Sequence, residues 1–259
     1  MLSTKRRSTV RGLIGLAGFL IIWELASLSH LVDPTYIPPP STVAIQVGKL
    51  FSTPEFNADL IATVLAWLIA LAIGTAIAVP LGLLLGSVPG IRVASSAIVD
   101  FLRPIPGVTL IPVVIVAFGD GAQTKIILAV FTAVWPLLFN VIYGVHEVDP
   151  QLVDTAQVFR TNRLRIAFAV KLPCVIPFAL TGIRLSAALS LITIVSTEFL
   201  DGSGVGFGAY IYNNAQASGD MGIQLGGVVI AGLLGYLVNQ ALVSIQNNWF
   251  AWSPESRVS

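Results

Sequence analysis

Six predominantly apolar stretches divide this chain of 259 residues. They cover residues 12–31, 58–86, 94–118, 125–143, 177–200 and 222–245. A helix needs about 20 apolar residues to cross the hydrocarbon core of a bilayer. Lipid offers no hydrogen-bond partner to the backbone, so only helices and closed barrels can span it. The sequence therefore predicts an all-α membrane protein with six transmembrane helices.

The composition excludes an ordinary soluble protein. Hydrophobic residues make up 55% of the chain, Asp, Glu, Lys and Arg together make up 10%, and the mean hydropathy is +0.86. Soluble domains carry about 25% charged residues. The net charge of +1 does not favour a nucleic acid as partner. The single cysteine, Cys174, excludes an intrachain disulfide and a thiolate metal cluster, so we expect no metal site.

The first apolar stretch has two interpretations. It follows a basic tail, and the part from Gly12 to Trp23 has the length of a signal-peptide core, with a passable cleavage site at 27–29. Apolar residues continue beyond Trp23, however, to the length that a bilayer crossing needs. We expect a cytoplasmic tail over residues 1–11 followed by a transmembrane helix. Glu24 within that helix must face protein or water, because an intramembrane carboxylate is costly.

The distribution of Lys and Arg predicts the orientation. Six spans place both termini on one side, and the side richer in Lys and Arg is the cytoplasmic one. With a cytoplasmic amino terminus, the opposite side holds only Lys49 and Lys125. The cytoplasmic segments then hold ten such residues: Lys5, Arg6, Arg7, Arg11, Arg92, Arg160, Arg163, Arg165, Lys171 and Arg257. We therefore predict that both termini are cytoplasmic.

The third stretch is irregular. Pro104, Pro106 and Gly107 fall within a few residues of each other, and Pro112 follows. A broken helix at membrane depth is tolerated only where protein or a water-filled cavity satisfies the freed backbone groups. The stretch can therefore line a pathway, or it can simply break at the cytoplasmic end of its span. The residues alone leave both interpretations open.

A charged insert, residues 149–173, separates the fourth and fifth stretches. Asp149 suits a helix N-cap and Pro150 the first helical position. Leu152, Ala156 and Phe159 then fall on one face at helical spacing. We expect a second short helix from 163 until the proline at 173 stops it. Such a pair of helices can form a wedge for a soluble partner or lie on lipid headgroups.

The insert resembles the cytoplasmic signature loop of ATP-binding-cassette importer permeases. That signature is Glu-Ala-Ala, three residues, Gly, nine residues, then Ile, any residue, Leu and Pro. The triplet 154–156 takes the first position, and Val170, Leu172 and Pro173 fall at the required distance for the end. Two departures stand out. Asp154 and Thr155 replace Glu and Ala, and Arg160 stands at the family's glycine, so we expect Asn162 to take over the turn two residues later.

Other segments resemble the nitrate, sulfonate and taurine branch of the same family, in the same order along the chain. They are Tyr36–Ser41, Leu102–Pro106, Ile111–Pro112, Phe118–Gly119, and the Glu198 segment with its trailing 204–206. The resemblance runs from about Tyr36 to the carboxyl end.

This resemblance implies a single permease domain over 12–259 in the bacterial cytoplasmic (inner) membrane, with a cytoplasmic coupling loop at 146–173. It implies a second copy of the chain, two cytoplasmic ATPase subunits, a periplasmic or lipid-anchored solute-binding protein and membrane lipids as partners, and no nucleic acid. The chain contains no phosphate-binding loop, so it is expected to be a non-catalytic subunit without a cofactor, while the ATPase uses ATP and Mg. The expected ATPase-coupling residues are Leu152, Asp154, Thr155, Ala156, Phe159, Arg160, Arg163 and Pro173.

Candidate pathway residues come from the third and fifth stretches. Ser186, Ser190, Thr193 and Thr197 share one face, where they can contact solute or, as small hydroxyls more commonly do, join helices. The two arginines among the candidates, near the inner ends of their spans, can attract an anion or pair with lipid phosphates. Glu198, near the outer end, can cap residues 202–206 or contact the binding protein. The candidates are Arg103, Pro104, Pro106, Arg184, Thr193, Thr197 and Glu198.

The expected solute is a small organic anion such as a sulfonate, taurine or nitrate. Two other classes compete. An ion-coupled secondary transporter or channel would use Glu24, Glu198 and Arg184, and it leaves the charged insert unexplained. An intramembrane enzyme would need a convergent catalytic set, which the sequence does not contain.

Overall fold

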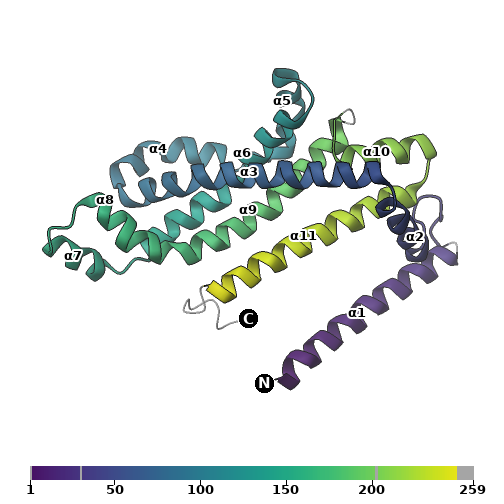
Figure 1. The fold of residues 1–259 in the computed structure, drawn as a ribbon, viewed down its shortest axis with the longest axis horizontal. Helices are drawn as coiled ribbons and strands as arrows, with labels where there is room; N and C mark the ends of the chain where they lie inside the picture. The colour runs from purple at the N-terminus through teal and green to yellow at the C-terminus, as the bar shows by residue number, and fades with distance from the viewer. Residues whose placement is uncertain (1, 30, 202–203, 250–259) are drawn as a thin grey trace.

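The structure is a computed structural model that describes residues 2–29, 31–201 and 204–249, with side chains described from Val10 to Gln246 within these ranges. All of its regular elements within these ranges are helical, as predicted (Figure 1). η1 is a 3₁₀-helix and η2 a π-helical turn. In chain order they are α1 (Leu2–Leu28), α2 (Pro40–Phe51), α3 (Pro54–Ser87), α4 (Pro89–Leu102), η1 (Gly107–Leu110), α5 (Ile111–Phe118), α6 (Ala122–His146), α7 (Pro150–Val158), α8 (Arg163–Ile166), η2 (Ala167–Lys171), α9 (Leu172–Asp201), α10 (Phe207–Ser218) and α11 (Met221–Trp249).

Five helical segments in the described part of the chain are long and apolar enough to cross a membrane. They are Val10–Leu28, Pro54–Ser87, Ala122–His146, Arg163–Asp201 and Met221–Gln246. The third span is irregular, as predicted: it is a bent pair, Pro89–Leu102 and Gly107–Phe118, which meet at 74°. Counting the pair as one span gives six. The break falls where the prolines interrupt helical hydrogen bonding, since proline has no N–H to donate.

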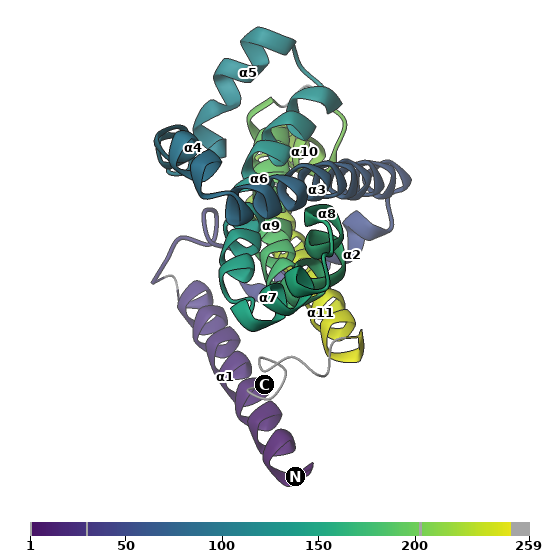
Figure 2. The same cartoon turned by 90° about the vertical axis from the view of Figure 1, so that its left-hand side faces the viewer.

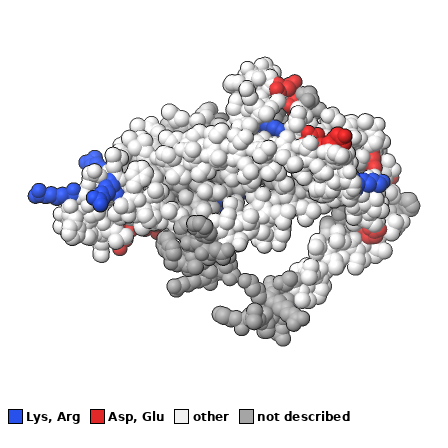
Figure 3. Space-filling model, viewed as in Figure 1, with Lys and Arg blue, Asp and Glu red and all other residues white. Residues whose placement is uncertain are grey.

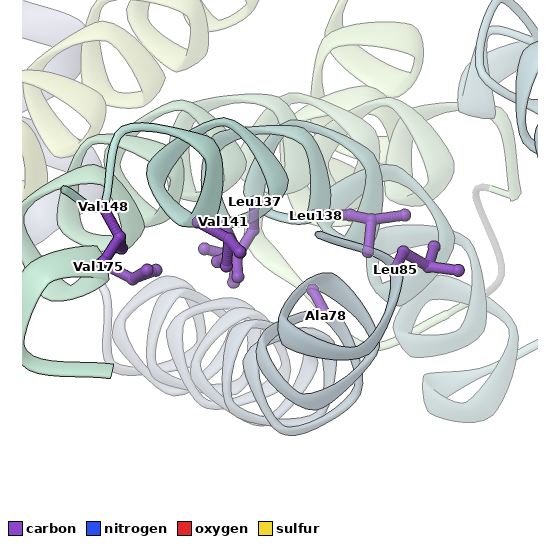
Figure 4. Packing of buried hydrophobic residues seen from close by; sticks show 8 residues of the cluster. Ala78, Leu85, Leu137, Leu138, Val141, Val148 and Val175 are labelled. Atoms are coloured by element: carbon purple, nitrogen blue, oxygen red, sulfur yellow. The ribbon is translucent and has the colours of Figure 1, made fainter. Parts of the chain in front are cut away.

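Helices α3, α6 and α9 form the central bundle. Small residues recur along α3 against α6: a Cβ added to Gly74 would lie 3.1 Å from Ala133 Cβ, and one added to Gly82 would lie 2.6 Å from Val141 Cγ1. Bare glycine surfaces let helix backbones approach closely in lipid, as the sequence led us to expect. Figure 4 shows the resulting core, which includes Ala78 of α3.

Helix α1 diverges from the rest of the protein (Figures 1 and 2). Its apolar side chains are largely exposed. Its carboxyl end is attached by side-chain hydrogen bonds. Glu24 accepts from Ser41 N at 3.1 Å and from Ser41 Oγ at 2.7 Å, and Ser27 Oγ donates to Ile37 O at 2.8 Å. Glu24 therefore faces protein, as expected of a carboxylate in an apolar helix.

The expectation that Pro173 stops the second helix of the insert is wrong. The chain stays helical from Arg163 to Asp201, and Pro173 lies in the first turn of α9. The π-helical turn η2 lies directly before it, with Leu172 N donating to Ala167 O. Local π-helical adjustment is a known way to accommodate a proline in a membrane helix. The fifth span thus extends several residues before its predicted start at 177.

Candidate functional site

Helices α7 and α8 project together from one end of the bundle, called here the α7–α8 end (Figures 1 and 2). Asp149 caps α7 as predicted, because its Oδ1 accepts from Gln151 N at 2.9 Å. Pro150 follows at the first helical position, where its missing N–H leaves no bond unmade. The start of α7 is thus set by local interactions of Asp149 and Pro150.

Two half-buried residues of α7, Val153 and Ala156, face the protein, and Val153 packs against the core cluster of Figure 4. Asp154 and Thr155 are exposed, as are the other two members of the predicted apolar stripe, Leu152 and Phe159. The predicted stripe therefore divides between the two faces of the helix. Exposed apolar residues that sequence reasoning missed are Val158, Leu164 and Phe168. The apolar surface of this end is hereafter Leu152, Val158, Phe159, Leu164 and Phe168.

The turn after α7 differs from the sequence expectation. Arg160 itself adopts the left-handed conformation, with φ of 53°, and its N–H donates to Gln157 O at 2.8 Å. Thr161 N donates to Ala156 O at 3.1 Å, which completes a Schellman motif. Asn162 does not take over this turn but caps α8, since its Oδ1 accepts from Arg165 N at 2.7 Å. Arg160 thus occupies the family's glycine position in the conformation that glycine favours.

Charge is unevenly distributed between the two ends of the bundle. Lys and Arg gather over α7 and α8, whereas most Asp and Glu side chains in view lie toward the opposite end (Figure 3). Arg160, Arg163 and Arg165 are all exposed at the α7–α8 end. This end therefore combines apolar side chains with a cationic rim, on a scaffold fixed by a cap and a Schellman turn.

A cavity of about 540 Å³ lies where the bent pair breaks. Arg103, Pro104 and Pro106 line it together with residues of α6 and α9, among them Thr193. The Arg103 guanidinium carbon lies 4.1 Å from the centroid of the Phe139 ring, in a cation–π contact. The structure therefore brings four of the predicted pathway residues to one cavity.

The predicted hydroxyl stripe is buried between α9 and its neighbours. Ser186 Oγ donates to Ala133 O of α6 at 2.5 Å, and Thr193 Oγ1 donates to Thr132 Oγ1 at 3.1 Å. Thr197 Oγ1 donates to Thr193 O at 2.7 Å within α9. The bonds of Ser186 and Thr193 to α6 match the helix-joining use of small hydroxyls in membranes. Of the stripe, only Thr193 also lines the cavity.

Glu198 lies instead in a buried ion pair at the opposite end of the bundle, called here the α10 end. Its Oε1 is 2.6 Å from Lys125 Nζ, and the Glu198 and Lys125 side chains are only 2% and 6% exposed. Thr63 Oγ1 lies 2.9 Å from both Glu198 oxygens, and Gly208 N donates to Oε2 at 3.1 Å. Glu198 therefore caps α10. Of the predicted target 202–206, residues 202 and 203 lie outside the described residues.

Sequence reasoning missed Lys125 as the partner of Glu198 and counted it as a surface charge. Its Nζ also donates to Val205 O at 2.5 Å. A lysine and a glutamate in two apolar stretches are a weak signal for such a pair, because either alone is equally consistent with an interface. Arg184 stands apart from both sites, and its Nε donates to Asn239 Oδ1 of α11 at 3.3 Å.

Comparison with known proteins decides the family. The profile of the binding-protein-dependent transport system inner membrane component matches residues 78–251, well over half of the chain. The chain belongs to this family. It is accordingly the permease subunit of an ATP-binding-cassette importer, a non-catalytic multi-pass protein of the inner membrane that works with an ATPase and a binding protein.

Individual relatives agree. The permease is 29% identical over 245 residues to the bicarbonate transport system permease protein of Synechococcus elongatus, covering 90% of this chain and 87% of that protein. It is 24% identical over 249 residues to the taurine transport system permease protein of Escherichia coli, covering 93% and 88%. Its fold is similar to that of an inward-facing MetNI methionine transporter, with a TM-score of 0.61 at 21% identity over 71% of this chain and 91% of the other.

Proposed function

We propose that this permease forms the solute pathway of an ATP-driven importer for a small oxyanion, such as a sulfonate, taurine, nitrate or bicarbonate. The α7–α8 end is the observation that carries the proposal, because it presents a rigid surface with exposed apolar residues to a partner outside the bundle. The two relatives described above carry bicarbonate and taurine in their names, which supports the class of solute.

In the assembly that we propose, two copies of the permease join two ATPase subunits and an external binding protein, within the lipids of the inner membrane. The ATPase uses ATP and Mg. The coupling loop 146–173 seats in a groove of the ATPase, with Phe159 and Leu152 as apolar contacts and the exposed Asp154 as a polar one. The remaining coupling residues are Thr155, Ala156, Arg160, Arg163 and Pro173.

Movement of α7 and α8 can reach the bundle because both are joined to it. Val153 packs on the core of α3 and α6, and α8 continues through η2 into α9 without a break in the helix. Closure of the ATPase dimer would therefore act on α9 along its axis. We place the pathway beside the cavity lined by Arg103, Pro104, Pro106 and Thr193, in contact with α9.

The other pathway candidates receive different roles in this proposal. Glu198 joins α9 to α6 near the α10 end through Lys125, the Thr197 hydroxyl bonds to Thr193 O within α9, and Arg184 joins α9 to α11 through Asn239. They act by fixing the bundle around the pathway rather than by contacting solute.

Asp154→Arg combined with Phe159→Asp tests the coupling surface. Because both side chains are exposed, the permease should reach the membrane and unfold thermally as the wild type does. Co-purification of the ATPase should fall by at least about tenfold, since truncating a central apolar anchor typically removes about 2 kcal/mol or more of binding energy. ATP-dependent uptake should fall with it.

The matched control is Asp154→Asn with Phe159→Leu, which keeps the size and apolar character of the surface. It should retain most of the association and uptake. Wild-type co-purification and uptake by the charge-reversed double variant would show that α7 is not the docking element.

A further inference from the structure

We propose that the cavity at the break between α4 and η1 is a solute site within the permease, in which Arg103 binds the oxygen atoms of a small oxyanion. This inference rests on the proposed function and adds a specific binding residue to it.

Arg103 carries a charge that the protein leaves unmatched. Its guanidinium lies against the Phe139 ring, and in the described residues no carboxylate lies within ion-pair distance of it. A cation–π contact also provides no acceptor for N–H groups, so the five donors of the side chain stay available. A cation of a membrane protein must face water or an anion, and Arg103 is an exposed residue. The cavity is where Arg103 meets that requirement.

The position of Arg103 is fixed by the surrounding fold. It is the C-cap residue of α4, and Pro104 and Pro106 follow where the chain bends by 74°. Gly107 then packs so closely against Thr132 of α6 that a Cβ there would overlap the hydroxyl. The break is thus held against α6, and the Phe139 ring of the same helix orients the guanidinium.

The cavity walls suit a small anion. Its volume of about 540 Å³ falls within the range of roughly 300–1,000 Å³ that is usual for small-molecule sites. Trp135, Leu185 and Leu189 supply apolar walls, and low-dielectric walls concentrate the field of a charge within a cleft. The Thr132 and Thr193 hydroxyls lie on the same lining, but their protons are already donated, that of Thr132 to Leu128 O and that of Thr193 to Thr132 Oγ1 or Leu189 O. Arg103 is therefore the donor that the cavity offers to an anion.

Arginine matches this ligand class in geometry as well as charge. Nitrate, bicarbonate and sulfonates each present two oxygens side by side, and the planar guanidinium can donate to both at once. A lysine provides the charge but not the two parallel N–H donors. Substitution by lysine should therefore weaken the site, whereas substitution by glutamine should remove it.

The test uses the complete transporter, with its ATPase and binding protein, in proteoliposomes. Uptake of labelled nitrate, bicarbonate and taurine is measured beside the ATP hydrolysis that the loaded binding protein stimulates. Arg103→Gln should lower uptake at least tenfold while stimulated hydrolysis persists, and Arg103→Lys should fall between this variant and the wild type. Lys49→Gln, which removes an exposed cation of α2 far from the cavity, should leave uptake unchanged.

A second measurement addresses binding directly. The permease–ATPase complex without binding protein is heated in the transported anion and in chloride of equal ionic strength, because a ligand of the folded state raises the unfolding temperature. The wild type should show an anion-specific rise and Arg103→Gln should not. Wild-type uptake by Arg103→Gln, or an equal thermal rise in both proteins, would overturn the site. If the wild-type transporter hydrolyses ATP but takes up none of the three anions, the proposed solute class is wrong, and the anion site at Arg103 is then also disproved.

Discussion

Lys125 and Arg103 are two cations of the membrane part that the protein treats in opposite ways. Lys125 is buried at the α10 end and paired with Glu198, and a backbone carbonyl accepts a further hydrogen bond from it. Arg103 lies at the edge of a cavity with only an aromatic ring against it. Charge in one region is neutralised within the chain, whereas charge in the other is left available. The difference separates a structural use of charge from a use in binding.

Lys125→Met should produce the largest effect on stability, because it leaves Glu198 buried without its counter-charge. Breaking one side of a buried ion pair typically destabilises by about 3–5 kcal/mol. Thermal unfolding of the purified permease should show this loss, and Lys125→Met with Glu198→Gln should recover part of it. Arg103→Met is the matched control and should change stability far less. Equal losses for Lys125→Met and Arg103→Met would remove the distinction between the two regions.

Gly206→Ala should give a smaller loss of stability, at a residue that packs against the Glu198 carboxylate. Gly206 has φ of 153°, and a Cβ there would overlap the Glu198 carboxylate. Residues forced into such backbone regions cost about 1–3 kcal/mol. Gly219→Ala is the control, because its φ of 67° is also strained but open space surrounds it. A melting temperature equally lowered in both variants would mean that backbone strain alone, and not the fit around Glu198, matters at this position.

Arg160→Gly should give the smallest effect, and in the opposite direction. Arg160 has a strained backbone, since a non-glycine residue in the left-handed conformation costs about 1–2 kcal/mol. Glycine removes this strain, but part of the gain is lost because glycine also gives the unfolded chain more conformational freedom. We expect a net stabilisation of about 0.5 kcal/mol, measured as slower amide hydrogen exchange in α7. Arg160→Ala removes the same charge but keeps the Cβ, so it should not slow the exchange. If Arg160→Ala slowed the exchange as much as Arg160→Gly, the stabilisation would come from removal of the charge and not from relief of backbone strain.

The sequence predicts the features of this permease that depend on neighbouring residues. The apolar stretches, the Asp149 cap and the small residues of α3 are all local patterns, and each is found in the structure. The Lys125–Glu198 pair joins residues 73 positions apart, and no periodicity connects them. The cavity was equally inaccessible to sequence reasoning, because proline positions predict a break but not which helices then surround it.

Two local predictions also failed for physical reasons. At Pro173 the bundle holds the chain helical, and a change of backbone hydrogen bonding accommodates the proline. At Arg160 the Schellman bonds fix a left-handed residue despite its side chain. In both places tertiary or capping interactions outweigh the preference of a single residue type.

The π-helical turn between α8 and α9 has a rotational consequence. Successive residues of an α-helix are about 100° apart, and a π-helical turn holds one residue more than an α-helical turn. The two helices are therefore out of phase by about that angle. Within α8 itself, Ile166 is buried and Leu164 is exposed. Deleting one residue from Ala167–Lys171 would return them to a common phase and rotate α8 about its axis. The face that this permease offers at its α7–α8 end is thus set by one backbone register within a single membrane helix.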